Sequence, residues 1–176
     1  MNVAIARYGA GNVRSVELAL RRLGAQLTDD LATADLAILP GVGSARSCME
    51  GLGASVEVLR ERHAAGKPIL GICLGLQLAL EESEEDGGVP GLGIVPGRAV
   101  RLQDERVPRI GWATVDPGGE AYWFAHSYAA KSPATVATSE GHSAIVEHGS
   151  FTGVQFHPEK SGAAGARFLE RCLSRV

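Results

Sequence analysis

Strand-like apolar runs alternate with helical patterns through the first half of the chain. From Val13 to Leu23, for example, apolar residues recur at helical spacing, and Gly24 ends that helix. Strands are predicted over 2–7, 25–28, 35–40 and 68–73. Helices are predicted over 12–23, within 44–65 and over 74–83. Because such alternation places helices on both faces of a parallel sheet, the predicted fold class is α/β.

The second half of the chain is rich in short strand-like segments separated by turns, from 93–102 to 151–157. These segments predict an antiparallel or mixed extension, so that the central sheet is mixed but mostly parallel. Phe168, Leu169 and Cys172 share one face of a closing helix. No repeat or low-complexity linker divides the chain, and residues 1–176 are therefore predicted to form a single domain.

The composition argues against several classes of function. The chain has 176 residues, a hydrophobic fraction of 45% and a net charge of −3, which suit one well-buried domain. No cluster of lysine and arginine favours nucleic-acid binding, and no apolar run is long enough to span a membrane. The N-terminus lacks the features of a signal peptide. Three widely spaced cysteines without a CxxC pair argue against a disulfide framework or a zinc site and favour the cytoplasm.

One cysteine lies between two glycines, where a predicted strand becomes a predicted helix. The motif GICLG (71–75) has the spacing of the nucleophile elbow, G-x-S-x-G, with Cys73 at its centre. Glycines relieve crowding at such a turn, and the helix N-terminus favours the reactive thiolate. The N–H of Leu74 would point toward a developing oxyanion. The alternative is a buried cysteine that acts only as a small hydrophobic residue, which is our interpretation of Cys48 and Cys172.

A cysteine nucleophile needs a base, and the base needs an orienting group. Among the five histidines, His157 is the best candidate, because Glu159 follows it with Pro158 between them. In an extended segment the two side chains would point the same way, so the carboxylate could bind one imidazole nitrogen while the other faces the thiol. The alternative is a histidine–glutamate pair in a surface turn.

Three further features bear on a substrate site. The glycine-rich turn LPGVGS (39–44) could supply a second oxyanion donor, a backbone wall for the substrate or a phosphate cradle. Gln77 lies one helical turn after Cys73 and shares its face, so a polar substrate could satisfy its carboxamide; alternatively, it caps local backbone groups. The run EESEEDGG (81–88) has the composition of a solvated, acidic helix end.

These motifs together resemble the class I, triad-type glutamine amidotransferases. GICLGLQ, the PGVG loop and the downstream HPE carry that resemblance. Within the class, the chain is similar to the glutaminase subunits of imidazole glycerol phosphate synthase along nearly its whole length, and YGAGN (8–12) and HPEKS (157–161) are the most specific stretches. The fold that the resemblance implies is a mixed sheet flanked by helices.

The resemblance implies hydrolysis of L-glutamine to L-glutamate and ammonia through a thioester, without a metal or an organic cofactor. It makes Cys73 the nucleophile, His157 the general base and acid, and Glu159 the orienting carboxylate. The N–H groups of Leu74 and Val42 would form the oxyanion hole. The residues that match the family's substrate-binding positions are Gly43, Gln77, Glu85, Ser127 and Tyr128.

The resemblance also implies a partner, a (β/α)8 cyclase subunit. That subunit would use the ammonia to form imidazole glycerol phosphate and aminoimidazole carboxamide ribotide in histidine biosynthesis. The predicted interface lies around Asn12, Trp123 and Lys160, because the subunit-specific stretches fall there. The sequence departs from the family at Arg109 and Ala113, where histidine and asparagine are common, and at Trp123, where another aromatic residue is usual.

Three alternatives remain open from the sequence. One is a glutaminase of the same class that serves pyridoxal phosphate, GMP or carbamoyl phosphate synthesis. Another is a cysteine hydrolase or chaperone-like protein with the same elbow but a different acid. The third is a binding module that uses the glycine loops for a nucleotide or phosphate. Ligand binding by such a module would survive thiol alkylation, whereas a glutamine-like chloroketone would inactivate a glutaminase irreversibly.

Overall fold

A computed structural model of the chain describes residues 1–9 and 13–175. The strands of its central sheet are β1 (Asn2–Ile5), β2 (Gln26–Thr28), β3 (Leu36–Leu39), β4 (Ile69–Ile72), β11 (Thr135–Ser139), β12 (His142–His148) and β13 (Phe151–Val154). This seven-stranded sheet has the order β11-β12-β13-β4-β3-β1-β2. The strands from β13 to β2 run parallel, whereas β12 pairs antiparallel with both β11 and β13. The predicted mixed, mostly parallel α/β sheet is therefore confirmed.

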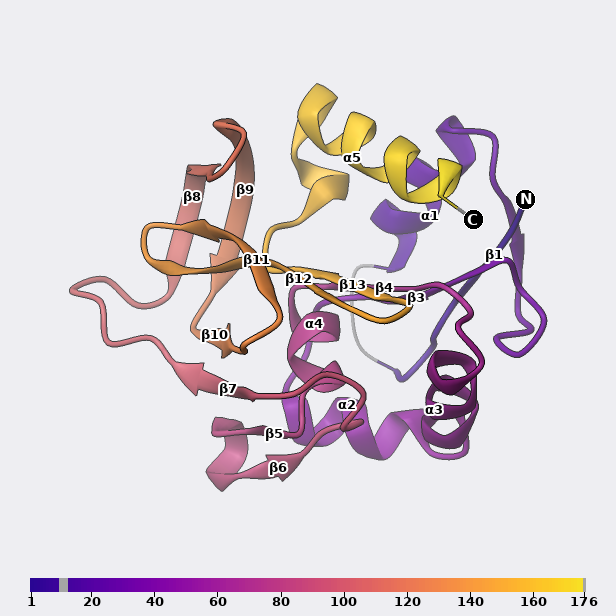
Figure 1. The fold of residues 1–176 in the computed structure, drawn as a ribbon, viewed down its shortest axis with the longest axis horizontal. Helices are drawn as coiled ribbons and strands as arrows, with labels where there is room; N and C mark the ends of the chain where they lie inside the picture. Colours follow the sequence, from indigo (N-terminus) through magenta and orange to yellow (C-terminus); the bar gives the residue numbers. More distant parts are fainter. Residues whose placement is uncertain (10–12, 176) are drawn as a thin grey trace.

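Helices cover both faces of the central sheet (Figure 1). In that view α1 (Val13–Arg22) and α5 (Gly162–Ser174) lie above it. Below it lie α2 (Ala45–Leu52), α3 (Ser55–Ala64) and α4 (Leu74–Ala79). Each upper helix buries one apolar stripe, with Leu20 in α1 and Leu169 in α5 among the buried residues. Helical spacing of apolar residues produces such a stripe, so the closing helix forms as the sequence predicts.

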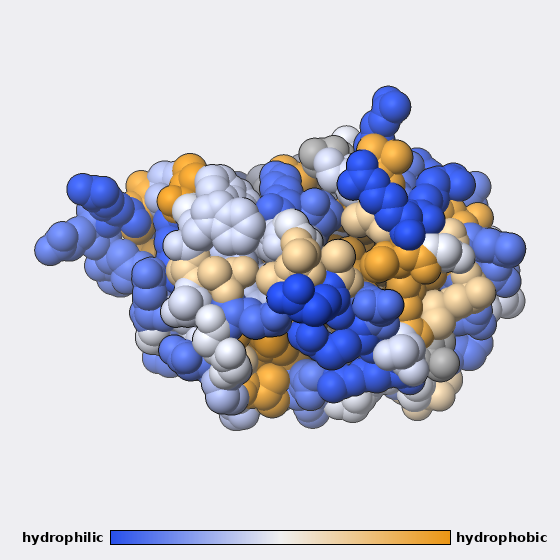
Figure 2. Space-filling view, turned by 90° about the horizontal axis from the view of Figure 1, so that it is seen from above, coloured by the Kyte–Doolittle hydropathy of each residue, from blue (hydrophilic) through white to orange (hydrophobic). Residues whose placement is uncertain are grey.

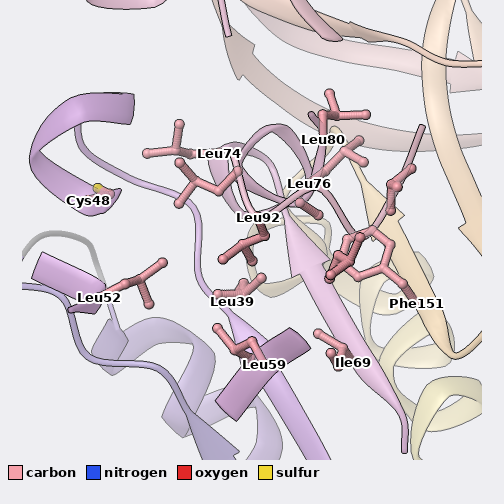
Figure 3. Packing of buried hydrophobic residues seen from close by; sticks show 14 of the residues in the cluster. Leu39, Cys48, Leu52, Leu59, Ile69, Leu74, Leu76, Leu80, Leu92 and Phe151 are labelled. Carbon is pink, nitrogen blue, oxygen red and sulfur yellow. The ribbon is translucent and has the colours of Figure 1, made fainter. Parts of the chain in front are cut away.

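The hydrophobic core below the sheet holds α4 in place (Figure 3). Leu39 of β3, Leu59 of α3 and Leu76 of α4 are fully buried in it, together with Phe151 of β13. Full burial of such a side chain contributes about 1.5–3 kcal/mol. Because α4 begins directly after Cys73, this core also fixes the position of the candidate nucleophile.

Two predicted helices and the acidic segment differ from the structure. Gly53 ends α2 with a positive φ of 48°, so the region 44–65 forms two helices rather than one. Helix α4 ends at Ala79, because Leu80 adopts an extended conformation with ψ 174°. The acidic run then forms strand β5 (Glu82–Ser83) and a short 3₁₀ helix, η1 (Glu85–Gly87). The expectation of a solvated helix end was therefore wrong.

Only part of the strand-rich second half extends the central sheet. Strands β11 to β13 do so, whereas β7 (Arg98–Arg101) and β10 (Tyr128–Lys131) join β5 and β6 (Val89–Pro90) in a second sheet. Strands β8 (Arg109–Val115) and β9 (Glu120–His126) form a separate antiparallel hairpin. The alternation of side chains identifies a strand but not its pairing partner, and the prediction of one extended sheet failed for that reason.

The surface seen from above is mostly hydrophilic, with apolar residues in patches between the hydrophilic ones (Figure 2). In the part of the chain that the structure describes, no helix combines the length and the apolar character needed to cross a membrane.

Candidate active site

The predicted site residues meet at the carboxyl ends of three neighbouring parallel strands. Strand β3 leads into the loop 40–44, β4 leads into Cys73, and β13 leads into the segment 155–157. Ligands of open α/β sheets bind at this edge, because the loops that follow parallel strands converge there.

Cys73 occupies a strained turn between β4 and α4. Its φ of 48° and ψ of −105° lie in a region that residues other than glycine rarely adopt. The backbone N–H of Cys73 donates to the carbonyl of Val154 at 2.6 Å, which ties the turn to β13. A Cβ on Gly75 would collide with the carbonyl oxygen of Leu39, and one on Gly71 would lie 2.6 Å from the ring of Phe151. The glycines on both sides of Cys73 are therefore required by close packing.

His157 connects the cysteine to Glu159. Its Nδ1 lies 2.9 Å from Oε1 of Glu159, and the two side chains are only 4% and 3% exposed. Burial lowers the pKa of His157, but hydrogen bonds with Cys73 and Glu159 outweigh that effect and raise the pKa to about 9. The imidazole is therefore protonated at neutral pH and can share its proton with the sulfur.

The backbone between His157 and Glu159 is not the extended segment that the sequence predicts. Residues Pro158–Lys160 form a 3₁₀ helix, η2, after His157 in extended conformation. The turn of η2 brings the carboxylate back to Nδ1, so the predicted contact forms through a different backbone path. Pro158 suits the first position of such a turn because it needs no backbone N–H there.

A cavity of about 340 Å³ opens beside Cys73. It has the volume of a small-molecule site. Of the predicted site residues, the structure brings these to its wall: Val42, Gly43, Cys73, Leu74, Gln77, Glu85, Ser127 and Tyr128. The predicted oxyanion donors and substrate contacts therefore share one cavity with the cysteine.

Two polar side chains of that wall have defined partners. The Nε2 of Gln77 donates to the carbonyl of Tyr128 at 2.7 Å and to Oε1 of Gln155 at 3.2 Å. The Oε2 of Glu85 accepts from the backbone N–H of Ala45 at 2.8 Å, at the start of α2. Burial raises the pKa of Glu85. Its carboxylate is thus directed to the cavity side of η1 and is not a freely solvated surface group.

Comparison with known families agrees with this geometry. The family model described as "Glutamine amidotransferase class-I" matches residues 4–176. This chain belongs to the class I glutamine amidotransferase family. The predicted family membership is therefore confirmed.

Relatives of this amidotransferase carry a more specific name. "Imidazole glycerol phosphate synthase subunit HisH" of Exiguobacterium sibiricum is 43% identical, with 96% of this chain and 92% of the relative covered. The protein of the same name from Mycolicibacterium paratuberculosis is 38% identical, with 99% and 98% covered. Nearly the whole length of the chain therefore has counterparts in these subunits.

Solved structures agree on the fold. A crystal structure described as glutamine amidotransferase superposes with a TM-score of 0.79 at 19% identity and covers 99% of both chains. A chain from the structure of PurLQS from Thermotoga maritima gives a TM-score of 0.73 at 17% identity, with 99% and 98% covered. At these identities the likeness supports the amidotransferase fold alone.

Two buried polar residues of this amidotransferase site were missed from the sequence. His126 lines the cavity and donates from Nδ1 to the carbonyl of Tyr128 at 2.9 Å. Burial lowers the pKa of His126 to about 4, so this imidazole is neutral. Gln155 is 0% exposed and lies 3.4 Å from the sulfur of Cys73. The sequence signal that could have identified Gln155 is its position two residues before His157. Alternate residues of an extended segment point to the same side, so Gln155 and His157 can both face the cysteine.

Gly41, which also lines the cavity, belongs to the predicted turn LPGVGS (39–44). The other cavity residues that sequence reasoning missed are Pro108, directly before β8, and Ile110 and Ala125 of the β8–β9 hairpin.

The predicted interface residues fall into three different situations. Asn12 lies outside the described residues. Lys160 is exposed in η2, and Trp123 is half-buried in β9, where its ring meets that of Trp112 edge-to-face at 6.0 Å. The backbone carbonyl of Trp123 also accepts from the N–H of His157 at 2.8 Å. A predicted interface residue is therefore hydrogen-bonded through its backbone to the residue that carries the imidazole.

Arg109 and Ala113, which depart from the family pattern, have structural contacts. Arg109 pairs with Glu140 at 2.9 Å, donates to Oγ of Ser139 at 2.7 Å, and lies over the ring of Phe124 at 4.3 Å. These contacts hold the β8–β9 hairpin against the β11–β12 turn. Ala113 packs against a second hydrophobic core, which includes Leu20 of α1 and Leu169 of α5.

Proposed function

We propose that this chain hydrolyses L-glutamine to L-glutamate and ammonia, and delivers the ammonia to a cyclase subunit of imidazole glycerol phosphate synthase for histidine biosynthesis. The observation that carries the proposal is the buried His157–Glu159 pair, whose imidazole interacts with Cys73 at the wall of a cavity. The names of relatives at 38% and 43% identity support this synthase over the other glutaminases of the class.

The first step is acylation of Cys73. The thiolate attacks the side-chain carbonyl carbon of glutamine, and the negative charge moves to the carbonyl oxygen. The N–H groups of Leu74 and Val42 stabilise that oxyanion, and the loss of one such donor typically costs about 10²–10³ in rate. His157, protonated because its pKa is raised to about 9, gives its proton to the departing nitrogen. Ammonia leaves, and the glutamyl group remains as a thioester on the sulfur.

The second step is hydrolysis of the thioester. His157 is now neutral and takes a proton from water as the oxygen of that water attacks the thioester carbon. Collapse of the second oxyanion expels the thiolate, and glutamate leaves. The imidazolium and the thiolate are thereby restored. Glu159 accepts a hydrogen bond from Nδ1 of His157 and so holds that nitrogen in the protonated form.

The ammonium group and the carboxylate on the α-carbon of the substrate would have different partners in the cavity wall. Both hydrogens of the Gln77 carboxamide are donated within the protein, so its Oε1 is the group left to face a ligand. That oxygen and the carboxylate of Glu85 can both accept hydrogens from the substrate ammonium group. Backbone groups of Gly43, Ser127 and Tyr128 would hold the carboxylate of the substrate.

The cyclase partner would bind over the hairpin side of the site. We propose that this partner is a (β/α)8 protein, with Asn12, Trp123 and Lys160 at the interface. Ile110 and Trp112 are 63% and 56% exposed on the same hairpin, and Ile110 also lines the cavity. Large exposed apolar residues beside an active-site mouth suit a surface that becomes covered in a complex. We place the enzyme in the cytoplasm, a reducing compartment that suits its free cysteines.

The direct test measures glutamine hydrolysis with and without the cyclase and its nucleotide ligand. We expect the wild-type chain to release glutamate and ammonia in the complex, and Cys73→Ala to release neither while keeping its thermal unfolding temperature. Ser47→Ala, at an exposed position of α2, is the matched control and should retain full activity. Ammonia release by Cys73→Ala at the wild-type rate would refute the assignment.

A further inference from the structure

A buried carboxamide that takes no part in the steps proposed above contacts the sulfur of Cys73. The side chain of Gln155 is 0% exposed, and its Nε2 lies 3.4 Å from Sγ of Cys73. Its Oε1 faces Nε2 of Gln77 at 3.2 Å. Gln155 therefore connects the nucleophile to the wall of the substrate cavity.

The orientation of both carboxamides follows from one backbone carbonyl. The carbonyl of Tyr128 can only accept, so the Gln77 atom that lies 2.7 Å from it must be the nitrogen. That nitrogen has a second hydrogen, which points at Gln155, so the Gln155 atom facing it must be the oxygen. The remaining Gln155 group, its NH₂, is consequently turned toward the sulfur.

The Tyr128 carbonyl that sets this orientation is itself fixed. It also accepts from Nδ1 of His126 at 2.9 Å, so both of its lone pairs are used. A flip of the Gln77 or Gln155 carboxamide would place two donors or two acceptors face to face in a buried site. Such a mismatch leaves buried polar groups unsatisfied, so the network has one stable arrangement.

We propose that Gln155 is a catalytic residue, whose carboxamide N–H donates a hydrogen bond to the sulfur of Cys73 and stabilises the attacking thiolate. This inference rests on the proposed glutaminase function, because it assigns Gln155 to the nucleophile of that reaction. The carbonyl of Ala125, 3.8 Å from the same sulfur, can only accept and therefore favours the protonated thiol. Gln155 is the closer neighbour and offsets that effect.

The test is the pH dependence of Cys73 alkylation by iodoacetamide, followed at Cys73 by peptide mass spectrometry. Gln155→Met keeps the length of the side chain but removes the donor. A hydrogen bond to a charged group changes an ionisation equilibrium by about one to two powers of ten. We therefore expect the midpoint of the alkylation profile to rise by about one to two pH units, with the wild-type plateau retained at high pH.

Gln155→Glu provides a second variant of almost unchanged shape. Its carboxylate cannot donate and repels the thiolate, so the midpoint should rise at least as far as in Gln155→Met. Gln103→Met is the matched control, because Gln103 is exposed and distant from the cysteine in the chain. Its profile should coincide with that of the wild type.

A purely structural role for Gln155 would lower the thermal unfolding temperature without moving the midpoint. Folded Gln155→Met and Gln155→Glu proteins with wild-type midpoints would therefore overturn the inference. The proposed function is judged separately, by glutamine hydrolysis of the wild type and its loss in Cys73→Ala. If hydrolysis follows that pattern while the Gln155 midpoints stay unchanged, only the role of Gln155 fails.

Discussion

Replacing Glu159 by glutamine would remove the negative charge that faces the imidazole of His157. The two side chains are 3% and 4% exposed, and their contact spans 2.9 Å, so little water screens it. A hydrogen bond to a charged group contributes about 1.5–3 kcal/mol, which corresponds to about one to two pKa units. We therefore expect the pKa of His157, about 9 in the native site, to fall toward its ordinary value.

The activity should follow that pKa. Acylation needs protonated His157, so activity is present below the pKa and is lost as the pH rises through it. In the wild type the alkaline limb of kcat/KM should lie near pH 9. In Glu159→Gln the limb should move down by about one to two pH units. The assay is glutamate release in the complex with the cyclase and its nucleotide ligand, across the neutral and alkaline range.

Stability should show the same linkage. Because the folded-state pKa of His157 is raised from 6.5 to about 9, the group contributes stability that is fully present below pH 6.5 and is lost as the pH rises through 9. Urea unfolding at several pH values measures this slope, which should flatten in Glu159→Gln. Glu50→Gln, an exposed position on α2, is the control and should change neither profile. An alkaline limb that stays at the wild-type pH in folded Glu159→Gln would contradict the reasoning.

Three further predictions address the elbow, the substrate and the partner. Gly75→Ala would drive a Cβ into the carbonyl of Leu39 and destabilise the fold by about 1–3 kcal/mol, which thermal unfolding would detect; an unchanged melting temperature would argue against tight packing there. Glu85→Gln should raise the KM for glutamine with little change in kcat, and an unaltered KM would remove Glu85 from the substrate site. Trp123→Ala and Lys160→Ala should weaken cyclase binding measured by calorimetry, and an unchanged affinity would place the interface elsewhere.

The parts of the site that could be predicted from the sequence are those set by local geometry. Gly71 and Gly75 indicate a crowded turn around Cys73, because a side chain at either position would strike neighbouring groups. His157 and Glu159 are close along the chain, so their contact forms even though the backbone between them is a 3₁₀ turn instead of an extended segment. A contact between residues this close along the chain can be predicted correctly even where the predicted secondary structure between them is wrong.

Features that depend on pairing across the chain could not be predicted. The sequence identifies β7 and β10 as strands, but nothing in their alternation indicates that they leave the central sheet and pair with each other. Glu85 was expected in a solvated helix end, whereas the end of α4 at Ala79 returns the chain toward α2. Each of these outcomes depends on long-range packing rather than on local propensity.

The two members of the catalytic pair, Cys73 and His157, each contact a different neighbouring residue. Glu159 contacts the imidazole of His157. Its charge therefore sets how readily His157 loses its proton, and with it the alkaline limb of the activity profile. Gln155 lies 3.4 Å from the sulfur, so its N–H acts on the attacking thiolate. Each of these neighbours therefore acts on a different member of the pair, Glu159 on the general acid and Gln155 on the nucleophile. The carboxylate follows His157 and the carboxamide precedes it, so one short segment after β13 places both.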